Sequence, residues 1–211
     1  RARSLAYGGD GGDTRAGLAA QDAALERGLA EQDEVGLWFS ADWFCQAILV
    51  YLLARLDGGS PSPLPRAGRR AAVSLVCIGE HPSVPETSCV LSFLSADHLH
   101  EQLHARVPVG PAHTGLARRA WNAMSAPTPT AVASLVREPM SELPFAREGL
   151  ARHVRELPAA GSGLSLSERH VLAELAGSPR SAIDLFPPVA AREARQWITD
   201  TMFADVLRRL A

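Results

Sequence analysis

The sequence has 211 residues, of which 46% are hydrophobic, and its formal net charge is −2 at pH 7. This length and composition support a folded core in one large domain or two small ones, and they argue against global disorder. All 21 basic residues are Arg, which excludes chemistry that requires a lysine amine, such as a Schiff base or a Walker-type phosphate loop.

Composition and cysteine count also indicate the type of organism and the cell compartment. Abundant Ala, Arg, Gly and Pro without any Lys is typical of a bacterial genome rich in G and C. The three cysteines, Cys45, Cys77 and Cys89, are odd in number and lack a C-x-x-C spacing, which favours reduced thiols. No apolar run is long enough for a membrane span and no signal peptide is evident, so we expect a cytoplasmic protein without a membrane partner. The chain starts without Met and ends inside a predicted helix, so we expect both ends to be incomplete.

The first elements of the chain are a loop, a helix, a strand and a second helix. Residues 1–14 are rich in Gly and Asp and predict a loop, whereas residues 15–30 carry leucines on one helical stripe. Residues 34–39 form a short apolar run typical of a buried strand. A polar elbow at residues 40–42 can cap the next helix, residues 43–56, in which apolar side chains recur every three or four positions.

A second buried strand is predicted at residues 70–78, after a linker rich in Gly, Ser and Pro at residues 57–68. Strand, helix and strand form a unit in which the two strands should be parallel. Parallel strands end at the same edge of a sheet, where α/β proteins usually bind their ligands. The alternative for the second strand end is an ordinary solvated loop before Pro82. The candidate ligand-binding residues at this edge are Ser40, Asp42, Gln46, Glu80 and His81.

Beyond Ser95 the whole chain predicts helices. Ser165 and Glu168 have the spacing of a capping box at the start of one of them. We therefore predict an α/β fold with a small parallel sheet and flanking helices, followed by a helical region and a truncated winged-helix-like end. The predicted boundaries are 1–105 for the α/β domain, 106–158 for the helical region and 159–211 for the helix-turn-helix-like domain. The expected helices after Ser95 are 95–105, 114–125, 130–137, 144–157, 164–176, 181–186 and 200–210.

One motif resembles a zinc site. His100, Glu101 and His104 match the pattern H-E-x-x-H, in which two imidazoles bind zinc from one helix face and the Glu serves as general base. The helix is short and polar, and a third ligand is not evident, although His113 or Glu138 could be proposed. We therefore favour an exposed helix face over a metal site, and we predict no cofactor.

The three C-terminal helices resemble the core of a winged-helix domain, a fold that often binds DNA. From Ser165 to Ala211, six Arg residues balance six Asp and Glu residues, so the unit has no net charge. Since phosphate contacts dominate affinity for DNA, a neutral unit favours a structural role over DNA binding.

Several stretches resemble an uncharacterised bacterial family, domain of unknown function 1835. The likeness runs through LWFSADWFCQAILVYLLARL at residues 37–56, SLVCIGE at 74–80 and LARRAWNAMSAPTPTAVASLV at 116–136. It continues through SELPFAREGLARHVRELP, GLSLSERHVLAEL and ITDTMFADVLRRLA, which end at Pro158, Leu175 and Ala211. The resemblance implies an N-terminal α/β domain, a set of helices and a winged-helix-like tail, but no activity.

The sequence departs from this family in two places. Members usually begin with a strand that ends in a T-N-G-D-S-like turn, which this chain lacks. The family's elbow carries Glu, His and Asp and then Asp and Gln, whereas here only Asp42 and Gln46 match. Glu and His are the residue types that acid–base or metal chemistry needs, so the resemblance implies that this elbow is a poor catalyst.

These observations favour a regulatory or accessory protein in which an α/β domain binds a small molecule or a protein partner and connects to a helix-turn-helix-like tail. The alternative is a hydrolase or transferase that acts on a small polar or phosphorylated substrate around Asp42, Gln46 and Glu80. Geometry discriminates among these hypotheses: three side chains that line one pocket favour an enzyme or a sensor, whereas side chains that point apart into solvent favour a protein that binds a partner.

Overall fold

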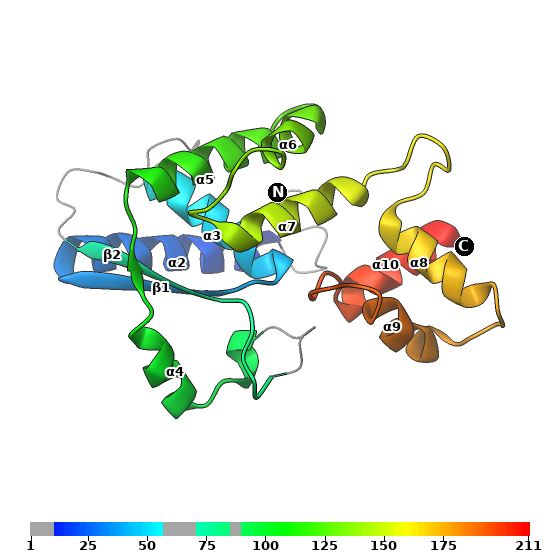
Figure 1. The fold of residues 1–211 in the computed structure, drawn as a ribbon, viewed down its shortest axis with the longest axis horizontal. Coiled ribbons are helices and arrows are strands. Elements are labelled where there is room, and N and C mark those ends of the chain that lie inside the picture. Colours follow the sequence, from blue (N-terminus) through cyan, green and yellow to red (C-terminus); the bar gives the residue numbers. More distant parts are fainter. Residues whose placement is uncertain (1–10, 57–70, 85–89) are drawn as a thin grey trace.

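The computed structural model describes residues 11–56, 71–84 and 90–211, which form a mostly helical α/β structure with a small sheet (Figure 1). The elements are α2 (Gly11–Glu31), β1 (Glu34–Ser40), α3 (Trp43–Leu56), β2 (Ala72–Ile78), a 3₁₀ helix η1 (Val90–Phe93), α4 (Ala96–Leu103), β3 (Val107–Pro108), α5 (Pro111–Met124), α6 (Thr130–Leu135), α7 (Pro144–Arg155), α8 (Leu166–Leu175), α9 (Ala182–Ala190) and α10 (Asp200–Leu210).

The predicted parallel pairing of the two strands is confirmed. β1 and β2 pair in parallel with Leu37 opposite Leu75 and Ser40 opposite Ile78, so both strands end at the same edge. The prediction of helices only beyond Ser95 is wrong, because β3 adds a two-residue antiparallel strand next to β2. Such a short strand has no periodicity to detect, and its Pro108 is tolerated because an edge strand needs no donor there.

The main core lies between one face of the sheet and the helices that cover it. Alternate strand residues such as Leu37, Phe39 and Leu75 point into this core. They meet Leu49 and Leu53 of α3 together with apolar residues of α5, α6 and α7, which stand above the sheet in Figure 1. The helices of the predicted region 106–158 therefore share a core with the sheet.

The other sheet face has a smaller apolar cover. Val76 and Ile78 of β2 pack with Val84, and residues of the η1 segment lie against them. Helix α4 lies beyond, on the side of the sheet opposite α5–α7 (Figure 1). No helix in the described ranges is long and apolar enough to cross a membrane.

The last three helices have a core of their own. Val171 of α8, Leu185 of α9 and Phe203 of α10 are buried together with Trp197, which precedes α10. The capping box of α8 is confirmed, since Ser165 and Glu168 exchange hydrogen bonds of 3.1 and 2.8 Å with each other's backbone amides. The predicted domain boundaries at 105/106 and 158/159 stay predictions.

Three boundary predictions were wrong by three or more residues. Helix α5 begins at Pro111 instead of Thr114. Helix α2 begins at Gly11, so the predicted loop does not extend to Thr14. Helix α9 continues to Ala190 instead of ending at Phe186, although Pro187 and Pro188 cannot donate backbone hydrogen bonds. The carbonyl groups that lose these donors belong to an exposed turn, where water can replace them. The predicted linker 57–68 and Cys89 lie outside the described residues.

Candidate functional site

The polar elbow between β1 and α3 is buried and forms its own hydrogen-bond network. The Ser40 hydroxyl donates to the Asp42 carboxylate, which also caps α3 by accepting from the Cys45 amide at 3.0 Å. Gln46 Nε2 donates to the Ser40 carbonyl at 2.7 Å and lies 3.3 Å from Cys77 Sγ. The structure thus brings Ser40, Asp42 and Gln46 together, but their polar atoms mainly hold the strand end against the helix.

Glu80 and His81 follow β2 at the same sheet edge, and they contact Arg195, His98 and Ser83. Glu80 is 76% exposed, and its nearest cation is Arg195, with 3.7 Å between Oε1 and Nη2. The His81 ring packs on the His98 ring with 4.5 Å between centroids, and its Nδ1 accepts from the Ser83 amide. The five predicted residues therefore share an edge without lining one pocket.

The two described cysteines lie beside the elbow, and burial suppresses their reactivity. Burial raises the pKa of Cys45 to about 11 against the smaller opposing effect of the Ser40 hydroxyl hydrogen bond. Burial also raises the pKa of Cys77, against the hydrogen bond from Gln46. Both thiols are free. Since the thiolate is the nucleophilic form, both are unreactive near pH 7.

The H-E-x-x-H residues lie at the exposed end of α4. The rings of His100 and His104 are edge to face with centroids 5.6 Å apart. The two proposed third ligands are engaged elsewhere, since His113 Nδ1 accepts from the Gly110 amide and Glu138 pairs with Arg119 at 2.7 Å. Within the described ranges, no group of three or more His, Cys, Asp or Glu residues is placed to hold a metal ion.

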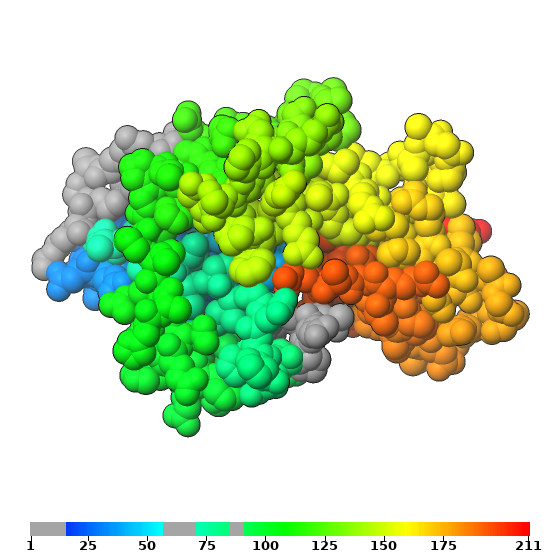
Figure 2. Space-filling view, viewed as in Figure 1, coloured from blue at the N-terminus to red at the C-terminus, as the bar shows by residue number. Residues whose placement is uncertain are grey.

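A pocket of about 320 Å³ lies next to the elbow, between the sheet edge and the C-terminal helices. Ala41 and Trp43 contribute from the elbow, α7 contributes one wall, and α8 with the segment after α9 contributes the other. Figure 2 shows the orange residues after α9 lying against yellow-green α7. Four Arg and two Glu line the pocket, and no Ser, Thr, Cys, Tyr or Asp does: the charged set is Arg152, Arg155, Arg192, Arg195, Glu148 and Glu193.

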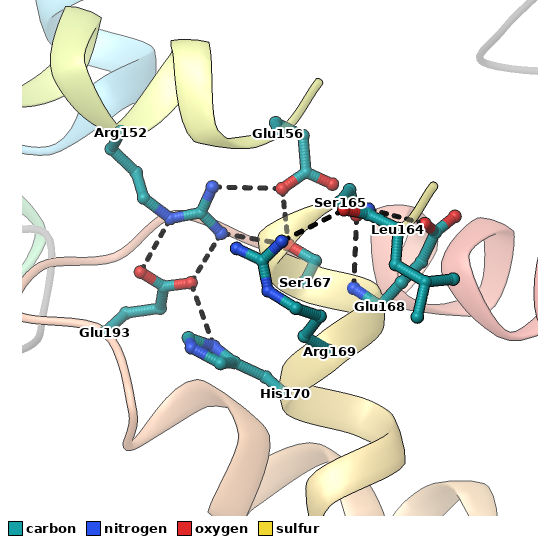
Figure 3. Close-up of polar contacts among 9 residues, drawn as sticks. All are labelled: Arg152, Glu156, Leu164, Ser165, Ser167, Glu168, Arg169, His170 and Glu193. Carbon is teal, nitrogen blue, oxygen red and sulfur yellow. Dashed lines mark hydrogen bonds and ion pairs between the residues drawn. The ribbon is translucent and has the colours of Figure 1, made fainter. Parts of the chain in front are cut away.

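Arg152 is the centre of the polar contacts around this pocket (Figure 3). Its Nε and Nη2 hold the two oxygens of Glu193 at 2.8 and 2.6 Å, a bidentate fork. Its Nη1 binds Glu156 at 2.9 Å and its Nη2 binds the Ser167 hydroxyl at 2.9 Å. The guanidinium also lies 4.2 Å from the ring centre of Trp197, within the range of a cation–π interaction. One side chain of α7 therefore contacts both α8 and the segment between α9 and α10.

The other three arginines differ in how far they are neutralised. Arg195 pairs with Glu148 at 2.9 Å and donates to the Gly79 carbonyl at 2.9 Å. Arg192 pairs with Glu174 at 2.6 Å. Arg155 is exposed and makes no ion pair within the described part of the chain. The pocket therefore has spare positive charge at Arg155.

Three aromatic rings form the apolar side of the pocket region. The Trp43 ring stacks on His153 with centroids 5.0 Å apart and an angle of 16°, and it lies 5.3 Å from the Trp197 ring. Gly149 makes this packing possible, because a Cβ there would lie 2.7 Å from Cε3 of Trp43. Trp43 and Trp197 are thus interface aromatics, and they line the pocket.

Two pocket-lining residues carry buried polar atoms without a hydrogen-bond partner in the described structure. They are Nδ1 of His170, which lies 3.5 Å from Glu193, and Nε1 of Trp197. Burial lowers the pKa of His170, against the opposing effect of Glu193, and burial also lowers the pKa of His153. Both imidazoles are therefore mostly neutral at pH 7. Buried polar groups are usually hydrogen-bonded, so unpartnered atoms beside a pocket are consistent with a site that binds something.

Comparison with models of protein families, with curated proteins and with solved structures gave no match. The resemblance to domain of unknown function 1835 therefore stays a prediction, and the site is described by its own geometry.

Sequence reasoning located the sheet edge but missed the residues that line the pocket beside it. Arg152, Glu193 and Trp197 belong to segments separated by about forty residues, so no local spacing links them. The i, i+4 spacing of Arg152 and Glu156 gives a weak signal, but it is equally typical of an ordinary exposed helix face.

Proposed function

We propose that this protein is a bacterial regulatory protein that binds a small anionic molecule between its α/β part and its C-terminal helices. The observation that carries the proposal is the pocket of about 320 Å³ lined by four arginines and two tryptophans. Ligand sites are typically concave and partly aromatic with a few convergent polar groups, and this volume suits a small ligand. Arg155, a lining arginine without an ion pair within the described residues, favours a negatively charged ligand.

The position of the pocket supports a regulatory role. One wall belongs to α7, which packs in the core of the sheet, and the other belongs to α8 and the segment before α10. A ligand that contacts both walls stabilises one relative placement of the two parts more than any other. Binding can thus be transmitted to α8–α10 without any chemical reaction.

We include the C-terminal helices in this proposal as a helix-turn-helix-like unit whose interaction with a partner changes when the ligand binds. Direct DNA binding has little support, because Arg208 and Arg209 of α10 are engaged by Asp205 and Glu168. A protein partner is the better candidate for this unit. The free thiols of Cys45 and Cys77 agree with the expected cytoplasmic setting.

The geometry favours binding over the hydrolase or transferase alternative. Asp42 and Gln46 are buried in the elbow network, and Glu80 turns to Arg195. The residues that line the pocket include no hydroxyl or thiol nucleophile.

Thermal unfolding in the presence of anions tests the proposal. Benzoate, citrate and inorganic phosphate are compared with sodium chloride at equal ionic strength. At ten times its Kd, a bound anion should raise Tm by about 3–6 °C through mass action. Arg155→Gln, which removes spare charge at the pocket, should reduce the shift. Arg119→Gln replaces an exposed arginine of α5 that does not line the pocket, so it should leave the Tm shift unchanged. Equal Tm in all salts, or equal responses of both variants, would refute the proposal.

A further inference from the structure

The carboxylate of Glu193 occupies the pocket in the way that an anionic ligand would. Glu193 lines the pocket, is only 10% exposed, and accepts both hydrogen bonds of the Arg152 fork. The planar guanidinium matches a planar carboxylate in this two-bond geometry.

The two partners differ in how firmly the fold holds them. Arg152 projects from α7, a twelve-residue helix whose buried face packs in the main core. Its other contacts, to Glu156 and Ser167, do not depend on Glu193. Glu193 lies in the segment between α9 and α10, which has no regular secondary structure at that point. Glu193 can therefore leave the fork by a local change in this segment while Arg152 remains in place.

The surface around the fork suits a flat apolar group. Trp43 and Trp197 line the pocket, and the remaining wall includes small residues: Ala41, Ala151 and Ala194. Aromatic groups also pack favourably edge to face against tryptophan rings. The volume of about 320 Å³ lies at the lower end for ligand sites, which favours a ligand of one or two rings.

We propose that the pocket binds a small aromatic carboxylate, whose carboxylate displaces Glu193 from the Arg152 fork and whose ring packs against the edges of Trp43 and Trp197 that line the pocket. This inference rests on the proposed function and adds the ligand class and the group that the ligand replaces. Without ligand, the Glu193 carboxylate occupies the Arg152 fork and holds the segment between α9 and α10 against α7.

Competition with Glu193 lowers the apparent affinity for the ligand. If the tethered carboxylate occupies the fork nine-tenths of the time, the ligand binds about tenfold more weakly than it would to an open fork. Glu193→Gln keeps the shape of the side chain but removes the charge that the fork holds. This substitution should therefore strengthen binding about tenfold.

The test is a benzoate titration followed by tryptophan fluorescence, because Trp43 and Trp197 both line the pocket. Wild type is compared with Glu193→Gln and with the matched control Glu156→Gln. Each variant removes one carboxylate from the same guanidinium, but Glu156 does not line the pocket. We expect about tenfold tighter binding for Glu193→Gln and less than a twofold change for Glu156→Gln.

Two further probes examine the ligand class. Cyclohexanecarboxylate has the carboxylate but lacks a flat ring. Inorganic phosphate is also an anion, but it has neither a planar carboxylate to pair with the Arg152 guanidinium nor a ring. Each should bind wild type at least tenfold more weakly than benzoate. Equal binding of benzoate and cyclohexanecarboxylate would overturn the aromatic assignment.

The possible failures are distinguishable. If wild type binds benzoate and Glu193→Gln binds it no more tightly than Glu156→Gln, the displacement inference fails while the proposed function stands. If neither wild type nor variants bind any of the anions, both fail. Should Glu193→Gln not fold, Glu193→Asp replaces it: the shorter side chain weakens the fork, so affinity for benzoate should rise severalfold, and an unchanged affinity overturns the inference.

Discussion

Arg152→Met lowers the free energy of unfolding by about 3 kcal/mol, because it leaves two carboxylates without their cation in a mostly buried place. Arg152 is 11% exposed and its partner Glu193 is 10% exposed, so water replaces the lost hydrogen bonds poorly. The cation–π contact with Trp197 is lost as well. Urea unfolding followed by circular dichroism measures the change.

The matched control for this prediction is Arg192→Met. Arg192 also pairs with a carboxylate from another element, Glu174, but it is 42% exposed. Exposed ion pairs contribute little, so this variant should lose less than about 1 kcal/mol. Equal losses in the two variants would contradict the view that Arg152 joins the α/β part to the C-terminal helices.

Gly149→Ala destabilises the protein by about 1–3 kcal/mol, although Ala is the better helix former. The new Cβ would lie 2.7 Å from Trp43 Cε3, and the Trp43 ring is packed between His153 and Trp197. The ring must therefore shift, which also alters the pocket wall. Urea unfolding and the benzoate titration should both detect the change.

Gly115→Ala is the control, because Gly115 also lies inside a helix, α5, and a Cβ there would meet nothing within 4 Å. This variant should gain about 0.5–1 kcal/mol from helix propensity alone. The two substitutions are thus expected to have opposite signs. A stabilising Gly149→Ala would show that the aromatic packing is loose and that the pocket wall adapts freely.

Local patterns predicted the elements that depend on local forces. We could predict the apolar run of β1, the helical spacing of α3 and the capping box at Ser165, because each depends on residues that are neighbours in the sequence. The parallel pairing of β1 and β2 followed from the connection between them. The two-residue strand β3 and the continuation of α9 through two prolines depend on tertiary surroundings and were missed.

The candidate site shows the same division. The sequence located the sheet edge and the polar residues at it, but side-chain burial decided their role: Asp42 became a helix cap and Gln46 a link between strand and helix. The neighbouring pocket draws on α7, α8 and the segment before α10, which meet only after folding. A constellation without periodicity or fixed spacing leaves no signal in a single sequence.

A crystal structure of the protein grown with benzoate tests the proposed ligand site most directly. We expect a benzoate carboxylate within hydrogen-bond distance of Nε and Nη2 of Arg152, its ring against the edges of Trp43 and Trp197, and the Glu193 side chain outside the fork. Glu193 still on Arg152 at full ligand concentration, with the pocket empty or the benzoate bound elsewhere, would contradict this proposal.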